Sequence, residues 1–211
     1  PKDMGPEDVA AFGELRHLSP RLHLPLQAGS DRVLARMGRK YDAARFLRLV
    51  EELRRARPDI ALSTDLIVGF PGESEEDFQD TLHMMRACDF MASFSFCYSD
   101  RPGTRASRFL DKIAPDVQQD RLLRLQALQD ELGNHWLAAR VGQEADVLLE
   151  GRSPRDAAAG SGESWQGRDA YGALVHVPLP AGDHLGRMVR VRIEHAHRHS
   201  LVGAVSEERP C

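Results

Sequence analysis

The sequence is poor in cysteine and has no long apolar run, and each absence narrows the class of protein. Its three cysteines, Cys88, Cys97 and Cys211, are too few and too scattered for a disulfide framework, which favours a reducing, cytoplasmic setting. No run of about 18 or more apolar residues is present, so we expect no membrane span. No signal-peptide pattern opens the chain, and because the first residue is Pro1 we expect the N-terminus to be a cut.

The composition is that of a globular protein with an uneven charge distribution. The chain has 211 residues, of which 42% are hydrophobic and 28% are charged, enough for one large domain or two small ones. The net charge of -4 argues against a simple nucleic-acid binder. Eleven Arg and Lys face four acids over residues 16–57, whereas eight acids face one Arg over residues 59–89. These neighbouring segments predict a polarised surface.

The first part of the chain alternates strand and helix patterns. Three apolar segments, at residues 21–27, 60–70 and 91–99, read as strands, and the middle one indicates burial on both faces. Helical patterns are expected at residues 6–17, 31–37, 42–57, 74–88 and 115–141. This order predicts parallel strands joined by right-handed crossovers. Because three strands make a poor core with an open edge, we interpret this part as a piece of a larger sheet or barrel.

The pattern changes to period two after the long helix. Short strands are expected at residues 144–151, 173–179, 187–194 and 200–205, with a polar loop over residues 151–172. We therefore predict an α/β domain over residues 1–138, an all-β antiparallel barrel over 139–206, and a tail over 207–211.

Polar residues lie where the predicted parallel strands end, which is where α/β folds bind ligands. The candidates for such a site are Gln27, Ser30, Arg39, Asp65, Val68, Gly69 and Tyr98. Asp65 offers a carboxylate to a ribose diol, and Arg39 offers a guanidinium to a carboxylate. The alternative is that these groups cap helices and satisfy loops.

Three long motifs resemble those of a known family. They read HLPLQAGSDRVLARMGRKY, STDLIVGFPGESEEDF and FSFCYSDRPGTRA, and they occur in this order and spacing. They resemble the C-terminal half of the radical S-adenosylmethionine methylthiotransferases, with YSDRPGT most similar to the branch that modifies tRNA. The period-two tail, with LLEG and SLVGAV, is similar to the RNA-binding TRAM barrel of these proteins.

The resemblance implies a fold and a cofactor site. It implies the last three βα units of a partial TIM-like barrel, followed by an OB-like TRAM barrel. Gln27 and Asp65 match positions that contact the ribose of S-adenosylmethionine, and Arg39 matches one that holds its methionine carboxylate. Residues 67–72, with Val68 and Gly69, match a strand motif that lies against the adenine, where glycine permits close approach. For Glu73 we favour an acid near a helix N-terminus.

The resemblance also implies two 4Fe-4S clusters, whose ligands are absent here. Family members bind them through a CxxxCxxC loop and three further cysteines, and neither set is present, so we expect this chain to be inactive without a preceding N-terminal part. Cys88, Cys97 and Cys211 read as buried or incidental thiols, and we expect no metal ligand in this chain. His195, His197 and His199 read as a strand end or turn.

The predicted function is the transfer of a methylthio group to isopentenyladenosine beside the anticodon of tRNA, as the resemblance implies. In the tail, Arg190, Arg192 and Arg198 are expected to meet RNA phosphates, and Trp165 and Tyr171 are expected to stack on bases from the loop. Two alternatives remain open: methylthiolation of an aspartate of a ribosomal protein, and a non-catalytic RNA-binding module.

Overall fold

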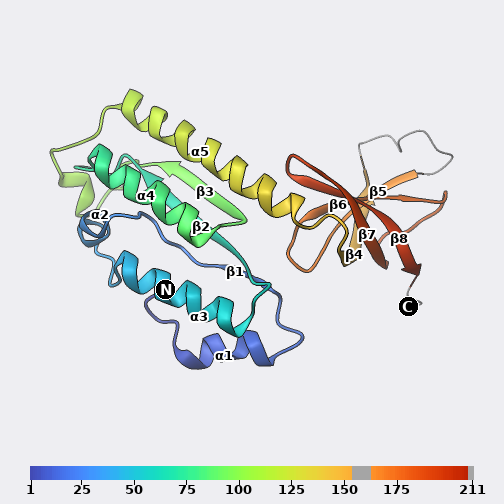
Figure 1. Ribbon diagram of the computed structural model, residues 1–211. Coiled ribbons are helices and arrows are strands. Elements are labelled where there is room, and N and C mark those ends of the chain that lie inside the picture. Colours follow the sequence, from blue (N-terminus) through green and yellow to red (C-terminus); the bar gives the residue numbers. More distant parts are fainter. Residues whose placement is uncertain (154–162, 209–211) are drawn as a thin grey trace. The chain divides into compact units, whose positions relative to one another are not determined.

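The computed structural model describes residues 1–153 and 163–208, and it divides into two units (Figure 1). The first unit covers Pro1–Leu132 and the second covers Gly133–Cys211. The predicted boundary at 138/139 follows the end of the long helix and stays a prediction. Cys211 and most of the predicted tail lie outside the described residues. Among the described helices, none combines the length and the apolar character that a membrane crossing requires.

The first unit is built around a three-stranded parallel sheet, as the alternating pattern predicts. Its strands are β1 (Arg21–His23), β2 (Ala61–Val68) and β3 (Ala92–Cys97), in the order β1-β2-β3. Its helices are α1 (Pro6–Glu14), α2 (Asp31–Arg36), α3 (Ala43–Ala56), α4 (Glu75–Cys88), the 3₁₀ turn η1 (Ala106–Arg108) and most of α5 (Pro115–Ala138).

The first strand is shorter than its sequence pattern indicates. Leu22, Leu24 and Leu26 alternate, yet the regular ladder ends at His23. Pro25 has no N–H to donate, and the N–H of Leu26 donates to the Thr64 hydroxyl at 2.9 Å in place of a backbone carbonyl. The pairing resumes as a single bridge between Gln27 and Leu66.

One face of the sheet is covered by helices. Leu62, Leu66 and Val68 of β2 point into a core that α1, α3, α4 and α5 complete. The largest of its fully buried side chains include Phe46, Phe78, Phe90 and Met85. Ser74 begins α4 with a capping box, because its hydroxyl accepts the Asp77 N–H and the Asp77 carboxylate accepts the Ser74 N–H.

The second unit contains a closed five-stranded barrel. Its strands are β4 (Glu144–Arg152), β5 (Glu163–Arg168), β6 (Leu174–Leu179), β7 (Met188–His197) and β8 (Ser200–Glu208), in the order β4-β5-β6-β8-β7. The pairs are antiparallel except β6 with β8, which is parallel. Apart from that pair, the predicted antiparallel barrel is confirmed.

The predicted loop over residues 151–172 is wrong where β5 forms. Only Trp165 and Gly167 of this strand are buried, so the sequence shows no apolar alternation. Gly167 is required because a Cβ there would lie 2.1 Å from the carbonyl oxygen of Leu148 on the neighbouring strand. Because one inward position holds glycine and not a large apolar residue, the sequence pattern does not reveal this strand.

Candidate functional site

The face of the sheet opposite the helices is exposed and carries a defined set of side chains. The parallel register places His23 beside Ser63, Asp65 beside Phe94, and Ile67 beside Phe96. We call these six residues the open face; Ser63 is fully buried, and the other five are at least partly exposed. Phe94 and Phe96 expose 51% and 56% of their area, although aromatic side chains of a sheet are normally covered. The open face therefore combines apolar surface with one carboxylate.

Asp65 is held in place by a histidine of the neighbouring strand. The Nε2 atom of His23 lies 3.3 Å from Oδ2 of Asp65, and its Nδ1 lies 3.1 Å from the Ser63 hydroxyl. The edge of the same imidazole packs on Phe94, with ring centroids 5.9 Å apart. A carboxylate can accept about four hydrogen bonds, so Asp65 keeps capacity for a ligand's hydroxyls. Sequence reasoning missed His23, whose only signal is its outward place between Leu22 and Leu24.

Gln27 lies directly beside Asp65, as expected of residues on neighbouring strands. Its N–H donates to the Asp65 carbonyl at 2.8 Å, and its carbonyl accepts the Ile67 N–H at 2.9 Å. Gln27 has a φ of 73°, a left-handed conformation that is costly for a residue with a Cβ. The chain therefore adopts an unfavourable backbone conformation at Gln27, four residues after the end of β1 and beside Asp65.

Ser30 is committed to a polar network at the start of α4. Its hydroxyl donates to the Asp77 carboxylate at 2.5 Å, and the same hydroxyl caps α2. Asp77 also binds the Arg32 guanidinium and the Ser74 N–H. Burial opposes ionisation of Asp77, but these hydrogen bonds outweigh it and lower its pKa. The structure gives Ser30 a structural role, so its predicted cofactor contact gains no support.

Arg39 lines a hollow that does not include Asp65. This hollow of about 320 Å³ is also lined by Asp31, Ala35, Lys40, Tyr41, Asp42 and Arg45. It includes neither Gln27 nor Asp65. The expectation that all three side chains line one pocket is therefore not met by this hollow, and the role of Arg39 stays a prediction.

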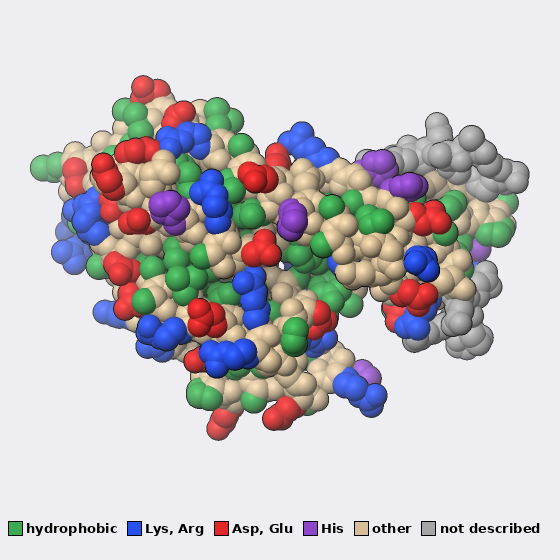
Figure 2. Space-filling view, viewed as in Figure 1, with side chains coloured by type: hydrophobic (Ala, Val, Ile, Leu, Met, Phe, Trp, Pro, Cys, Tyr) green, Lys and Arg blue, Asp and Glu red, His purple; other side chains and the backbone are tan. Residues whose placement is uncertain are grey.

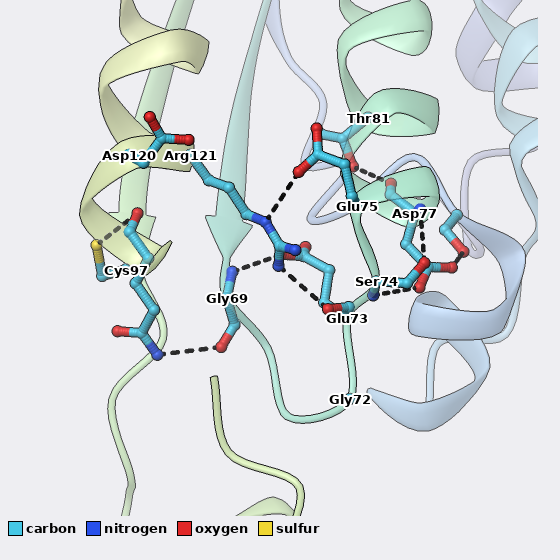
Figure 3. A network of polar contacts seen from close by, with 12 residues as sticks. Gly69, Gly72, Glu73, Ser74, Glu75, Asp77, Thr81, Cys97, Asp120 and Arg121 are labelled. Atoms are coloured by element: carbon cyan, nitrogen blue, oxygen red, sulfur yellow. Dashed lines mark hydrogen bonds and ion pairs between the residues drawn. The ribbon is translucent and has the colours of Figure 1, made fainter. Parts of the chain in front are cut away.

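The carboxyl end of β2 is fixed by a buried ion pair (Figure 3). The N–H of Gly69 donates to the Glu73 carboxylate at 2.7 Å, and the Arg121 guanidinium of α5 lies 2.8 Å from the same carboxylate. Burial raises the pKa of Glu73 despite these partners. Glu73 directly precedes Ser74, the N-cap of α4, so it lies near a helix N-terminus as expected, and its carboxylate also accepts the Gly69 N–H at the end of β2.

Two further candidates of the cofactor set are engaged within the protein. The Val68 side chain is fully buried in the core, and its carbonyl accepts the Tyr98 N–H at 2.8 Å. The side chain that β2 offers next to Val68 on the open face is Ile67. The Tyr98 hydroxyl donates to Asp100 at 2.9 Å, and its ring meets Phe70 edge-on at 5.1 Å.

Of the two aromatic candidates for RNA binding, Trp165 lies in a strand, and Tyr171 lies in the turn between β5 and β6. Trp165 is on β5, is 3% exposed, and meets the His184 ring edge-on at 5.3 Å, so its predicted stacking on a base gains no support. Tyr171 is half-buried and lies against Trp136 and the Arg140 guanidinium. Both rings contribute to the second unit itself.

The arginine candidates of the barrel differ in how far they are engaged. Arg190 pairs with Asp146 of β4 through two contacts of 2.9 and 3.1 Å. Arg192 is exposed on β7, and Arg198 lies in the turn between β7 and β8. Basic and acidic side chains are interspersed over the right-hand part of the view in Figure 2.

The cysteines and histidines do not form a metal site within the described residues. Cys88 is buried at the end of α4, where burial raises its pKa to about 12, and the Cys97 thiol lies 3.6 Å from the Gln118 carbonyl. His195 and His197 end β7 and His199 lies in the following turn, which confirms that prediction. No group of three His, Cys, Asp or Glu suited to a metal ion occurs in the described part.

Comparisons with known proteins cover both units. Residues 2–85 match the Radical SAM superfamily, and residues 138–205 match the TRAM domain. A tRNA-2-methylthio-N(6)-dimethylallyladenosine synthase of Nitratidesulfovibrio vulgaris is 57% identical over 205 residues, which are 96% of this chain and 45% of that protein. The protein of the same name from Lawsonia intracellularis is 51% identical over 203 residues, which are 96% of this chain and 44% of its own length.

Among solved structures, coproporphyrinogen III oxidase (HemN) from Escherichia coli, described as a radical SAM enzyme, aligns with a TM-score of 0.48 and 23% identity. The alignment covers 56% of this chain and 28% of that one. The chain spans a little under half of the length of the curated relatives that it matches.

Proposed function

We propose that this chain is the C-terminal part of a radical SAM methylthiotransferase that adds a methylthio group to isopentenyladenosine beside the anticodon of tRNA. The observation that carries the proposal is the 57% identity to a tRNA-2-methylthio-N(6)-dimethylallyladenosine synthase, which runs through both units. A relative that shared only the barrel would support RNA binding alone.

The open face is proposed to form part of the S-adenosylmethionine site. Asp65 is oriented by His23 and remains 35% exposed, which suits a carboxylate that accepts the two hydroxyls of a ribose. Ile67 and Phe96 lie in register on the same face and offer apolar surface to an adenine ring. When bound, S-adenosylmethionine supplies the methyl group and the hydrogen-abstracting radical in enzymes of this kind. The residues of this chain orient that cofactor.

The open face also supports the proposal that a preceding segment of the same protein completes the site. A three-stranded sheet with exposed Phe94 and Phe96 leaves apolar surface in contact with water unless another part of the protein covers it. Cys88 and Cys97 do not suit a 4Fe-4S cluster, because one thiol is buried at the end of a helix and the other contacts a backbone carbonyl. The ligands of both clusters are therefore proposed to lie in the preceding segment.

The barrel is proposed to bind tRNA, which would place the protein in the cytoplasm. Arg192 is its most exposed candidate on β7, whereas Arg190 is already paired with Asp146. The barrel over residues 139–206 has eight arginines and eight acids, so shape contributes more to this contact than net charge does.

The test is a deletion of the gene, followed by mass spectrometry of tRNA nucleosides and of the ribosomal proteins. We expect 2-methylthio-N6-isopentenyladenosine to disappear and to return with a plasmid copy of the gene. A plasmid carrying Asp65→Asn should restore it poorly, and Glu51→Gln, a matched change of an exposed acid on α3, should restore it fully. Unchanged tRNA with a lost methylthio group on a ribosomal protein would favour the alternative substrate and overturn this proposal.

A further inference from the structure

The segment after β3 forms an ordered loop with three arginines that have no carboxylate partner among the described residues, although the Arg105 guanidinium lies over the Phe109 ring at 5.9 Å. Arg101, Arg105 and Arg108 are exposed, and no carboxylate of the described residues lies within ion-pair distance of their guanidinium groups. The loop also contains Asp100, Asp111 and Lys112, which are all paired: Lys112 with Asp100, and Asp111 with Arg36 of α2. Its uncompensated charge is therefore positive and comes from the three arginines.

The loop is held in shape by its own contacts. Arg101 to Thr104 form a turn in which Gly103 has a φ of 83° and the Thr104 N–H donates to the Arg101 carbonyl at 3.2 Å. Lys112 closes the far end, because its ammonium group donates to the Ala106 carbonyl at 3.0 Å and lies 5.2 Å from the centre of the Tyr98 ring. A loop that is already ordered loses little conformational entropy when it binds a partner.

The loop lies at the carboxyl end of the parallel sheet, where α/β folds bind their substrates. It leaves the carboxyl end of β3, and the Tyr98 N–H bonds to the Val68 carbonyl at the carboxyl end of β2. In parallel α/β folds this end carries the reaction site. Arg105 directly precedes the 3₁₀ turn η1 and Arg108 is its last residue, and their i, i+3 spacing places them on one side of the turn.

We propose that Arg101, Arg105 and Arg108 bind the phosphate backbone of the RNA substrate at the carboxyl end of the sheet. This inference rests on the proposed function and adds a second RNA contact, in the first unit. The barrel alone has balanced charge, and its Arg190 is neutralised by Asp146, so arginines of the first unit that have no acidic partner would add local attraction to RNA phosphates. Unpaired guanidinium groups are the side chains best suited to phosphate.

The test measures binding of an anticodon stem-loop RNA to the natural full-length protein that contains this chain, over a range of salt concentrations. The variant is Arg101→Gln, Arg105→Gln and Arg108→Gln together. Its control is Arg16→Gln, Arg48→Gln and Arg55→Gln, which removes the same charge from exposed positions in or near α1 and α3.

We expect the loop variant to bind at least about tenfold more weakly near 0.1 M salt. The slope of log K against log salt should flatten by about 2, since each phosphate contact contributes about 0.7 to 0.9. The control variant should keep the affinity and the slope of the wild type. Wild-type binding with an unchanged loop variant, or equal losses in both variants, would overturn this inference alone. Absence of RNA binding by the wild type would overturn the proposed function as well.

Discussion

The guanidinium of Arg121 and the carboxylate of Glu73 form an ion pair at 2.8 Å, with only 6% and 1% of the two side chains exposed. Arg121 also donates to the Glu73 backbone carbonyl at 3.1 Å, and Glu73 accepts the Gly69 N–H. The pair therefore connects α5 to the turn that follows β2, and its two residues lie 48 positions apart in the chain. It fixes the strand end that precedes the first turn of α4.

Glu73→Gln should lower the free energy of unfolding of the first unit by about 3 to 5 kcal/mol. The change leaves the Arg121 charge buried without its counter-charge, which is the costly way to break such a pair. The measurement is urea unfolding followed by the helical circular dichroism signal. Glu75→Gln is the control, because Glu75 pairs with Arg124 at a half-exposed position and should cost under about 1 kcal/mol. Equal small losses would show that the buried pair contributes little.

Asp77 should make the first unit sensitive to acid. The folded-state pKa of Asp77 is below the ordinary value of 3.8, so its stabilisation is complete above about pH 4. It is then lost as the pH falls toward the folded pKa. Asp77→Asn should lower stability at neutral pH by on the order of 2 kcal/mol and flatten this acid dependence.

The control for Asp77 is Asp116→Asn, a change of an exposed acid in the first turn of α5. Unfolding free energies measured from pH 7 to pH 3 compare the two variants with the wild type. An unchanged acid slope in Asp77→Asn would contradict the assignment of this titration to Asp77.

Gly69→Ala should destabilise the protein more than Gly38→Ala does. Both glycines have a left-handed φ, of 69° and 76°, so each alanine has a similar conformational cost of about 1 to 2 kcal/mol. A Cβ at Gly69 would meet Cγ of Gln118 at 2.4 Å, whereas one at Gly38 would meet no atom within 4 Å. Denaturant unfolding should show a further loss of about 1 to 3 kcal/mol for Gly69→Ala. Equal losses would place the whole effect in the backbone conformation.

Asp65→Asn in the full-length protein should weaken S-adenosylmethionine binding by about 1 to 3 kcal/mol, because a carboxylate that accepts two hydroxyls is replaced by an amide. Titration calorimetry with the cofactor gives the affinity directly. Glu51→Gln should bind as the wild type does. A normal affinity in Asp65→Asn would contradict the ribose role and leave the open face with a different partner.

The order of elements in the first unit could be read from the sequence, because each signal was local. Helix starts at Ser74 and Asp42 carry their own capping side chains, and both are observed. The buried strand β2 is a short apolar run between turn residues, which is typical of a parallel strand.

The structural features that the sequence does not predict also have specific physical causes. Strand β5 was taken for a loop because its inward positions are Trp165 and Gly167, and only one of them is a large apolar residue. Arg121 looks like any surface arginine of an amphipathic helix, because its partner Glu73 lies far along the chain. The contact of His23 with Asp65 depends on the register of β1 against β2, which the sequence pattern does not specify.

The burial of Trp165 in the barrel has a spectroscopic consequence. The chain has two tryptophans, and both Trp136 and Trp165 belong to the second unit. Intrinsic tryptophan emission therefore monitors that unit alone, while most of the helical ellipticity comes from the first. A single denaturation experiment that records both tryptophan emission and helical ellipticity shows whether the two units unfold together or one after the other, without any added label.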